Sequence, residues 1–186
     1  MAENPQIVDL PAAAFTAREF RDALGLFPTG VAVVTTVDDK GRPQGITVNS
    51  FTSVSLDPPL VLVSIARTSR NFELFNKTKH FAVNLLHEEQ RAISNAFASQ
   101  AVADRFSQVK HRPGHGNSPL IEAHLVGFEC ETWARYDGGD HVLLLGKVVK
   151  LSLAPDRPAK PLLYFRGQYR ELSDVTEAPS VRLEGW

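Results

Sequence analysis

The sequence predicts a mainly β domain with flanking helices, in which the strands form an antiparallel, Greek-key-like barrel. Three observations support this fold class. About six or seven short runs rich in β-branched residues follow one another, turn residues separate several of them, and helical segments lie beside them. The length of 186 residues suits one domain, and 43% hydrophobic with 22% charged residues is ordinary for a folded chain.

The first element is a helix that begins at Thr16 and ends near Phe27 and Pro28. Thr16 and Glu19 have the spacing of a capping box, and Phe15 and Phe20 have that of a hydrophobic staple. Because a proline disfavours helical backbone in the residue before it, Pro28 marks the end of this helix.

Strands are expected next, and the first two form a hairpin around a turn at Asp38–Gly41. Leu60–Ala66 (LVLVSIA) is a nearly continuous apolar run, so we expect this strand to be covered on both faces. Proline and polar residues over Ser55–Pro59 end the strand pattern that precedes Leu60–Ala66. The strands of this half of the sequence are Gly30–Val37, Gly45–Val54, Leu60–Ala66 and Phe81–Leu86.

Two further helices are expected in this region: a short one capped by Ser69 and ending at Asn76, and a longer one over Glu88–Ser99. In the longer helix Ile93, Ala96 and Phe97 recur at helical spacing. The glycines, prolines and histidines of Lys110–Pro119 indicate a loop.

Three strands complete the domain: Val126–Tyr136, His141–Leu151 and Leu162–Leu172, the last bent at Gly167. The first of them alternates, which predicts one face made of Val126, Phe128, Cys130, Thr132, Ala134 and Tyr136, and an opposite solvated face with Glu129, Glu131 and Arg135. We therefore expect an arm over residues 1–14, the domain over residues 15–172, and a polar tail over residues 173–186.

Composition narrows the function classes. A net charge of −1 provides no field that would attract nucleic acid or an anionic membrane. No apolar run is long enough to span a bilayer, and the N-terminus lacks the pattern of a secretory signal. Cys130 is the single cysteine, so an internal disulfide is excluded, and we expect a cytoplasmic protein.

Chemical motifs are scarce. Neither a G-x-G-x-x-G fingerprint nor a phosphate-binding P-loop is present. His111 and His115 are four residues apart in a loop with no third ligand nearby in sequence, so we expect no metal site. Thr47–Ser55 carries an unusual number of hydroxyl and amide side chains, which fits either a solvated edge strand or a strand that binds a ligand. Arg67 and Ser69 follow a strand where a helix begins, a place suited to a phosphate group.

Four blocks of the sequence carry a resemblance when taken together: FPTGVAVVTT (27–36), GITVNSFTSVSLDPPLVLVSI (45–65), GDHVLLLGKV (139–148) and PLLYFRGQYREL (161–172), accompanied by FAVNLL and DRF. In this order and spacing they resemble the flavin reductase components of two-component flavin-dependent monooxygenases, which are short-chain NAD(P)H:flavin oxidoreductases with the FMN-binding split-barrel fold. The resemblance extends from about Phe20 to Leu172.

This resemblance implies site residues by position. The flavin would be bound by Thr29, Gly30, Thr47, Val48, Asn49, Ser50, Ser53, Val54 and Ser55, its phosphate by Arg67 and Ser69, and Phe106 would line the pocket. His141 would act in catalysis beside the nicotinamide, and Tyr169 would lie near the mouth of that site. Structural roles are the alternatives: His141 as part of a hairpin turn, Tyr169 in barrel packing, and Arg67 as a surface charge.

The implied reaction is the reduction of FMN or FAD by NADH or NADPH, with the reduced flavin diffusing to a separate monooxygenase component. A homodimer is also implied. The alternative function is a flavin-binding electron carrier or sensor without rapid turnover. The sequence does not distinguish FMN from FAD or NADH from NADPH, and it does not identify the oxygenase.

Overall fold

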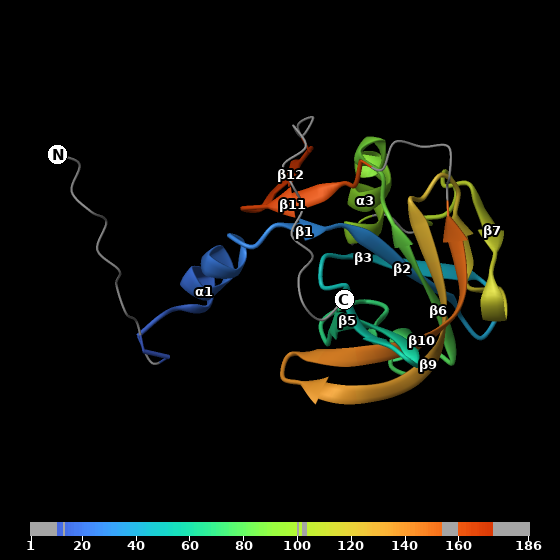
Figure 1. Cartoon of the computed structure of the whole chain (residues 1–186), viewed down its shortest axis with the longest axis horizontal. Helices are drawn as coiled ribbons and strands as arrows, with labels where there is room; N and C mark the ends of the chain where they lie inside the picture. Colours follow the sequence, from blue (N-terminus) through green and yellow to red (C-terminus); the bar gives the residue numbers. More distant parts are fainter. Residues whose placement is uncertain (1–10, 13, 100, 102–103, 154–159, 173–186) are drawn as a thin grey trace.

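A computed structural model of the chain describes residues 11–12, 14–99, 101, 104–153 and 160–172 (Figure 1). The expected tail over residues 173–186, and most of the expected arm over residues 1–14, lie outside these ranges. The fold is mainly β: a seven-stranded antiparallel sheet, a three-stranded sheet and a two-stranded hairpin, with short helices around them. Within the described residues, no helix is both long and apolar enough to pass through a bilayer.

The N-terminal helix α1, Ala17–Leu24, begins as the sequence predicts. The Thr16 hydroxyl accepts a hydrogen bond from the Glu19 backbone N–H at 3.2 Å, and the Glu19 carboxylate accepts one from the Thr16 N–H at 2.7 Å. The rings of Phe15 and Phe20 stack with their centroids 5.6 Å apart. The helix ends a few residues earlier than expected, and Figure 1 shows it projecting from the body of the molecule.

The expected strand Gly30–Val37 is divided between two sheets. β1, Thr29–Gly30, pairs with β11 in the three-stranded sheet, whereas β2, Ala32–Val37, lies inside the seven-stranded sheet between β3 and β6. Val31 lies between the two strands, and its carbonyl accepts a hydrogen bond from the Leu86 N–H at 3.0 Å.

The expected strand Gly45–Val54 is likewise two strands, β3 (Pro43–Val48) and β4 (Thr52–Leu56). They occupy opposite edges of the seven-stranded sheet, whose order is β3-β2-β6-β9-β10-β5-β4. A flat sheet of that size would separate its edges by about 29 Å, whereas the chain from Val48 to Thr52 reaches about 15 Å at most. The sheet must therefore curl until its edges approach, which is the barrel-like arrangement that the sequence predicts.

β5, Pro59–Ala66, follows β4 in a hairpin. One face of this strand, with Val61, Val63 and Ile65, is buried, whereas the alternate residues are only half-buried, so the predicted cover on both faces is complete on one face and partial on the other. α2, Phe72–Phe75, has Asn71 rather than Ser69 at its N-cap position, without a side-chain capping hydrogen bond. The Ser69 hydroxyl accepts a hydrogen bond from the Asn71 N–H at 3.3 Å.

β6, His80–Leu85, precedes the second expected helix. That helix starts as a 3₁₀ turn, η1 (Glu88–Gln90), and continues as α3 (Arg91–Ala98), with Phe97 fully buried. The expected loop Lys110–Pro119 contains a hairpin: β7 (His111–Pro113), the 3₁₀ turn η2 (His115–Asn117) and β8 (Pro119–Ile121).

β9, Val126–Gly138, and β10, His141–Leu153, form the long hairpin of the sheet. Two predicted orientations on β9 are wrong. Glu129 is 1% exposed, because its carboxylate accepts a hydrogen bond from the His115 N–H at 2.6 Å and lies 3.5 Å from the Lys150 ammonium. Tyr136, expected on the apolar face, is 55% exposed near the tip of the hairpin.

The last expected strand is a hairpin instead of a bent strand. β11, Leu163–Phe165, and β12, Gln168–Arg170, pair across a two-residue turn in which Arg166 and Gly167 have φ angles of 50° and 73°. Positive φ at both central residues is the geometry of a tight hairpin turn.

Among the residues that the structure describes, the core consists of two clusters separated by β2. Val34 faces the cluster inside the curled sheet, and Val33 faces the cluster beneath α3 and the three-stranded sheet. β2 is thus covered on both faces, which was expected of β5.

Candidate active site

Residues that are distant in sequence line one cleft of about 900 Å³. Thr29 comes from β1, and His141 comes from the start of β10. Asn49 comes from the segment of residues 49–51 that connects β3 to β4, here called the β3–β4 crossing. The end of α1 with the turn after it, and the β11–β12 hairpin, complete the walls: Arg21 to Phe27, Tyr164, Arg166 and Gly167. Three predicted site residues therefore converge.

A smaller cavity of about 170 Å³ shares Asn49 and Tyr164 with this cleft and extends toward α3. Thr47, Val48 and Tyr169, all predicted site residues, contribute to its lining. The Tyr169 hydroxyl is 2.8 Å from the Ser94 hydroxyl and donates to the Asn95 side-chain oxygen at 2.9 Å, so its ring is held against α3. Tyr169 thus both packs against α3 and lines the cavity.

Thr29 offers an unused hydrogen-bonding group beside the cleft, and Gly30 leaves open space there. The Thr29 hydroxyl oxygen is buried and has no hydrogen-bond partner within the described part of the chain. A Cβ atom added at Gly30 would have nothing within 4 Å, so space is open beside this backbone. Because an unsatisfied buried hydroxyl is costly, this position is suited to a polar group of a ligand.

His141 is the first residue of β10, and its Nδ1 lies 2.6 Å from the Asp140 carboxylate. The hydrogen bond from His141 and the charge of its ring lower the pKa of Asp140. An ionised carboxylate can only accept, so Nδ1 carries the hydrogen and Nε2 is available to a ligand. The imidazole is 39% exposed, which leaves it accessible from the cleft.

The polar residues of the β3–β4 crossing have mixed roles. The Thr47 hydroxyl donates to the Ser94 carbonyl at 2.7 Å, and the Ser50 hydroxyl accepts from the Ser64 N–H at 3.0 Å. These bonds fix the crossing against α3 and β5 and leave Asn49 exposed in the cleft. Ser53, Val54 and Ser55 lie on edge strand β4, outside the lining of this cleft.

Arg67 is engaged at the tip of the β9–β10 hairpin. Its Nε donates to the Gly139 carbonyl at 2.8 Å, its Nη2 pairs with the Asp137 carboxylate at 2.5 Å, and its guanidinium lies 5.6 Å from the centre of the Phe72 ring. Arg67 does not line the cleft. The structure therefore gives Arg67 a structural contact that the sequence did not reveal, and its role at the flavin phosphate stays a prediction.

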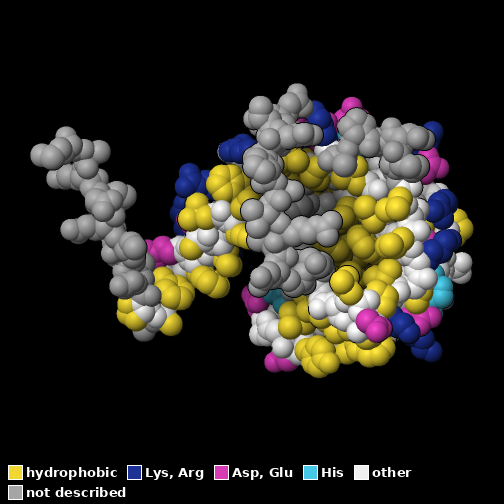
Figure 2. Space-filling model, viewed as in Figure 1, with side chains coloured by type: hydrophobic (Ala, Val, Ile, Leu, Met, Phe, Trp, Pro, Cys, Tyr) yellow, Lys and Arg dark blue, Asp and Glu magenta, His cyan; other side chains and the backbone are white. Residues whose placement is uncertain are grey.

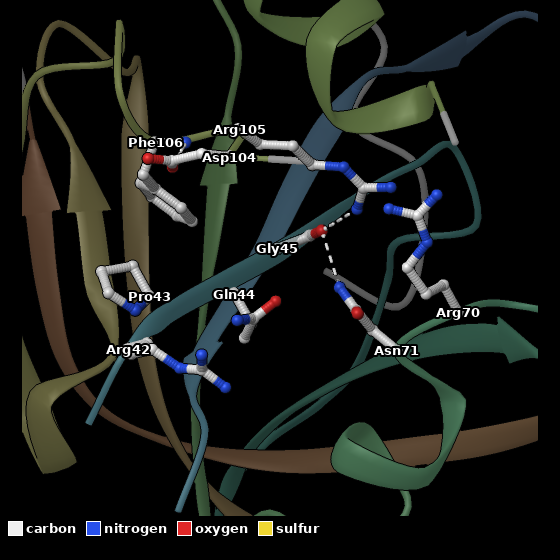
Figure 3. A pocket seen from close by; sticks show the side chains of 9 residues that line it. All are labelled: Arg42, Pro43, Gln44, Gly45, Arg70, Asn71, Asp104, Arg105 and Phe106. Carbon is white, nitrogen blue, oxygen red and sulfur yellow. Dashed lines mark hydrogen bonds between the residues drawn. The ribbon is translucent and has the colours of Figure 1, made fainter. Parts of the chain in front are cut away.

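A third cavity, of about 450 Å³, lies at the start of β3 and is rich in arginine (Figure 3). Arg42, Arg70 and Arg105 contribute to its lining. Arg105 donates to the carbonyls of Gly45 and Ser99, both at 2.7 Å. Burial, followed by the charge of Arg70, lowers the pKa of Arg105. With three arginines and one acidic residue, Asp104, in its lining, this cavity is a candidate anion site.

Phe106, a predicted site residue, lines this arginine cavity and packs edge-on against Phe97 with the ring centroids 4.8 Å apart. The arginines themselves are site candidates that sequence reasoning missed. The available signals were the DRF block, which contains Arg105, and the position of Arg70 directly after Ser69. Neither reveals that both guanidinium groups approach β3.

Comparison with known proteins agrees with this arrangement. A family model described as a flavin reductase like domain matches residues 24–173. The reductase component of a flavin-dependent trigonelline monooxygenase from Acinetobacter baylyi is 49% identical over 170 residues, covering 89% of this chain and 54% of that protein. The chain thus spans about half the length of that relative.

Solved structures give the same result. A nitrilotriacetate monooxygenase component B homologue from Mycobacterium thermoresistibile is 39% identical, with a TM-score of 0.85 over 90% of this chain and 93% of that one. An NADH:FAD oxidoreductase from Streptomyces globisporus, in complex with NAD and FAD fragments, is 33% identical, with a TM-score of 0.82 over 93% of this chain and 100% of that one. The chain belongs to the flavin reductase like domain family.

Proposed function

We propose that this chain is an NAD(P)H:flavin oxidoreductase that reduces FMN or FAD and releases the reduced flavin to a separate monooxygenase component. The observation that carries the proposal is the convergence of Thr29, Asn49 and His141 on one cleft. The names of the relatives support the same activity.

The residues of the cleft fit a flavin and a nicotinamide. Its volume of about 900 Å³ lies within the usual range for ligand pockets, roughly 300–1,000 Å³. The unpartnered Thr29 hydroxyl and the open space at Gly30 suit a polar, flat ring that approaches the backbone. A bound flavin would supply the hydride-accepting chemistry, so the protein needs neither a nucleophile nor a metal for that step.

The chain's own residues would bind and orient the reactants. Asn49 and Thr29 offer hydrogen-bonding groups to the flavin ring. Asp140 holds the His141 ring through Nδ1, and Nε2 is free to hydrogen-bond the nicotinamide carboxamide and align the hydride donor. His141 thus acts by positioning the donor rather than by forming a covalent bond.

For the phosphate of the flavin, two places are available. Sequence resemblance favours Arg67 and Ser69, whereas the arginine cavity presents Arg42, Arg70 and Arg105 along the same strand β3 that leads to Asn49. Because three arginines line one cavity there, whereas Arg67 lines neither that cavity nor the cleft, we favour the arginine cavity.

We also propose a homodimer. The eight-residue α1 has no buried residue and projects from the body, yet a helix this short is marginal in water without tertiary packing (Figure 1). Figure 2 shows hydrophobic side chains gathered on it, and Phe20, Leu24, Leu26 and Phe27 are each more than half exposed. A second copy related by a twofold axis would cover α1.

A cytoplasmic location of the protein fits the supply of NAD(P)H.

Steady-state oxidation of NADH and NADPH by the purified chain, with FMN, FAD or riboflavin added, tests the activity. Multiple turnovers with at least one pair of substrates are expected. Flavin binding without NAD(P)H oxidation above the enzyme-free rate would favour the electron-carrier or sensor alternative. Sedimentation velocity tests the dimer, and a fully active monomer at micromolar concentration would contradict it.

A further inference from the structure

Two histidines and a glutamate meet on the outer surface of the seven-stranded sheet. His80 begins β6, Glu131 lies directly opposite it on β9, and His115 comes from the turn η2 between β7 and β8. One nitrogen from each histidine and one carboxylate oxygen all lie within 4.8 Å of one another. Residues 80, 115 and 131 are thus brought together by three separate segments.

The turn that carries His115 is built to lie against His80. Gly116 has a φ angle of 58°, and a Cβ atom there would be 2.3 Å from Cγ of His80, so only glycine allows this approach. The backbone N–H of His115 donates to the buried carboxylate of Glu129 at 2.6 Å. The two imidazole rings pack edge to face with centroids 4.8 Å apart. The backbone of this turn therefore holds His115 against His80.

The cluster has unused binding capacity. His115 Nε2 lies 3.1 Å from the Glu131 carboxylate, which is the one ion pair of Glu131 within the described part of the chain. Nδ1 of His80 is buried and has no hydrogen-bond partner there. The side chains of His115 and Glu131 are 36% and 49% exposed, so an ion could enter from solvent.

We propose that His80, His115 and Glu131 bind a divalent first-row transition metal ion, with Zn²⁺ the best match. Two imidazoles and a carboxylate are ligands that Zn²⁺ accepts, whereas Mg²⁺ and Ca²⁺ prefer oxygen ligands alone. Tetrahedral bonds of 2.0–2.2 Å separate ligand atoms by about 3.3–3.6 Å. The present separations, up to 4.8 Å, need side-chain adjustments of about 1.5 Å. Water would take the fourth position.

The metal would act on stability rather than on flavin chemistry. None of the three ligands lines the cleft or the cavities described above. Figure 1 places β7 on the side of the molecule opposite α1 and the β11–β12 hairpin, which flank the cleft. An ion there would join the β7–β8 hairpin to β6 and β9. This site revises the expectation of no metal site, which considered only His111 and His115.

The experiment uses untagged, chelator-treated full-length chain. Titration with Co²⁺, followed by its visible absorption bands, and with Zn²⁺, followed by calorimetry, should give one ion per chain. Zn²⁺ at 100 times its dissociation constant should raise the melting temperature by roughly 5–10 °C. His115→Ala and the isosteric Glu131→Gln should weaken Zn²⁺ binding by at least about tenfold, since even the loss of outer-shell partners costs 10–100-fold.

The matched control is His111→Ala, which removes a nearby histidine outside the cluster and should leave Zn²⁺ binding unchanged. Absence of Co²⁺ bands and of a rise in melting temperature would overturn the proposal, as would equal Zn²⁺ affinity in His115→Ala and the wild type. Flavin reduction by His115→Ala should match the wild type. This readout separates failure of the metal site from failure of the proposed reductase function.

Discussion

Replacement of Arg67 by alanine distinguishes an anchor of the β9–β10 hairpin from a ligand of the flavin phosphate. The guanidinium contacts Asp137, the Gly139 carbonyl and the ring of Phe72. With side chains 44% and 78% exposed, the Arg67–Asp137 pair contributes at most about 1 kcal/mol. The carbonyl hydrogen bond adds up to about 1 kcal/mol, and the ring contact about 0.5 kcal/mol.

Solvent screening reduces this sum, so Arg67→Ala should lower the free energy of unfolding by about 1–2 kcal/mol. For a chain of this size the melting temperature should fall by roughly 2–8 °C. Because residues Asp137 to Asp140 lead directly into His141, a loosened turn should also raise the KM for NADH. The dissociation constant for FMN should change little.

The phosphate role predicts the opposite pattern. Loss of a charged hydrogen bond of about 1.5–3 kcal/mol would weaken FMN binding by roughly 10–150-fold and leave riboflavin binding unchanged. Under our preferred assignment, that FMN-specific loss belongs to Arg70→Gln in the arginine cavity.

Fluorescence titrations of FMN and riboflavin, with thermal melts of the apoprotein, decide between these roles. Asp137→Asn is the matched control: it should reproduce part of the loss in melting temperature, and if Arg67 binds phosphate it should strengthen FMN binding by freeing the guanidinium. An unchanged melting temperature in Arg67→Ala, together with a loss of affinity for FMN alone, would refute the anchoring role.

Three further outcomes are expected. His141→Ala should raise the KM for NADH or slow hydride transfer about 10–100-fold in stopped-flow measurements, with flavin affinity much less affected; unchanged kinetics would remove His141 from the nicotinamide site. Gly146→Ala should cost about 1–3 kcal/mol in urea unfolding, because the added Cβ would lie 2.4 Å from the buried Phe81 ring, whereas Gly30→Ala, with open space, should cost far less. Burial raises the pKa of Cys130 to about 12, so its thiol should resist Ellman's reagent at pH 8 until urea unfolds the chain. The contribution of the buried thiol to the free energy of unfolding should be lost as the pH rises from about 9 to about 12. Rapid reaction of the native thiol would contradict this.

Local interactions of the sequence were enough to predict several elements. The capping box of Thr16 and Glu19 needs only residues within one turn, and it forms as predicted. The hairpin of β2 and β3, the long pair β9 and β10, and the convergence of Thr29, Asn49 and His141 also follow from patterns and from the family resemblance.

Tertiary structure decided what depends on distant partners. The polar run Thr47–Ser55 is divided at Asn49 to Phe51 between β3 and β4, which lie at opposite edges of the sheet. This is possible because the curled sheet brings the two edges together, and no local feature of the sequence marks the division. Glu129 has the pattern of a solvated residue, but the β7–β8 hairpin covers it and supplies a backbone donor. Arg67 has the position of a phosphate ligand, but Asp137, seventy residues later, competes for its guanidinium.

The cluster of His80, His115 and Glu131 illustrates the same division most clearly. Sequence spacing singled out only His111 and His115, which are close along the chain, and predicted no metal site. Strand pairing instead places His80 beside Glu131, and a left-handed glycine folds His115 onto them. Short-range preferences are set by neighbouring residues and can be read from the sequence, whereas the meeting of three segments depends on sheet order and register, which only the folded chain establishes.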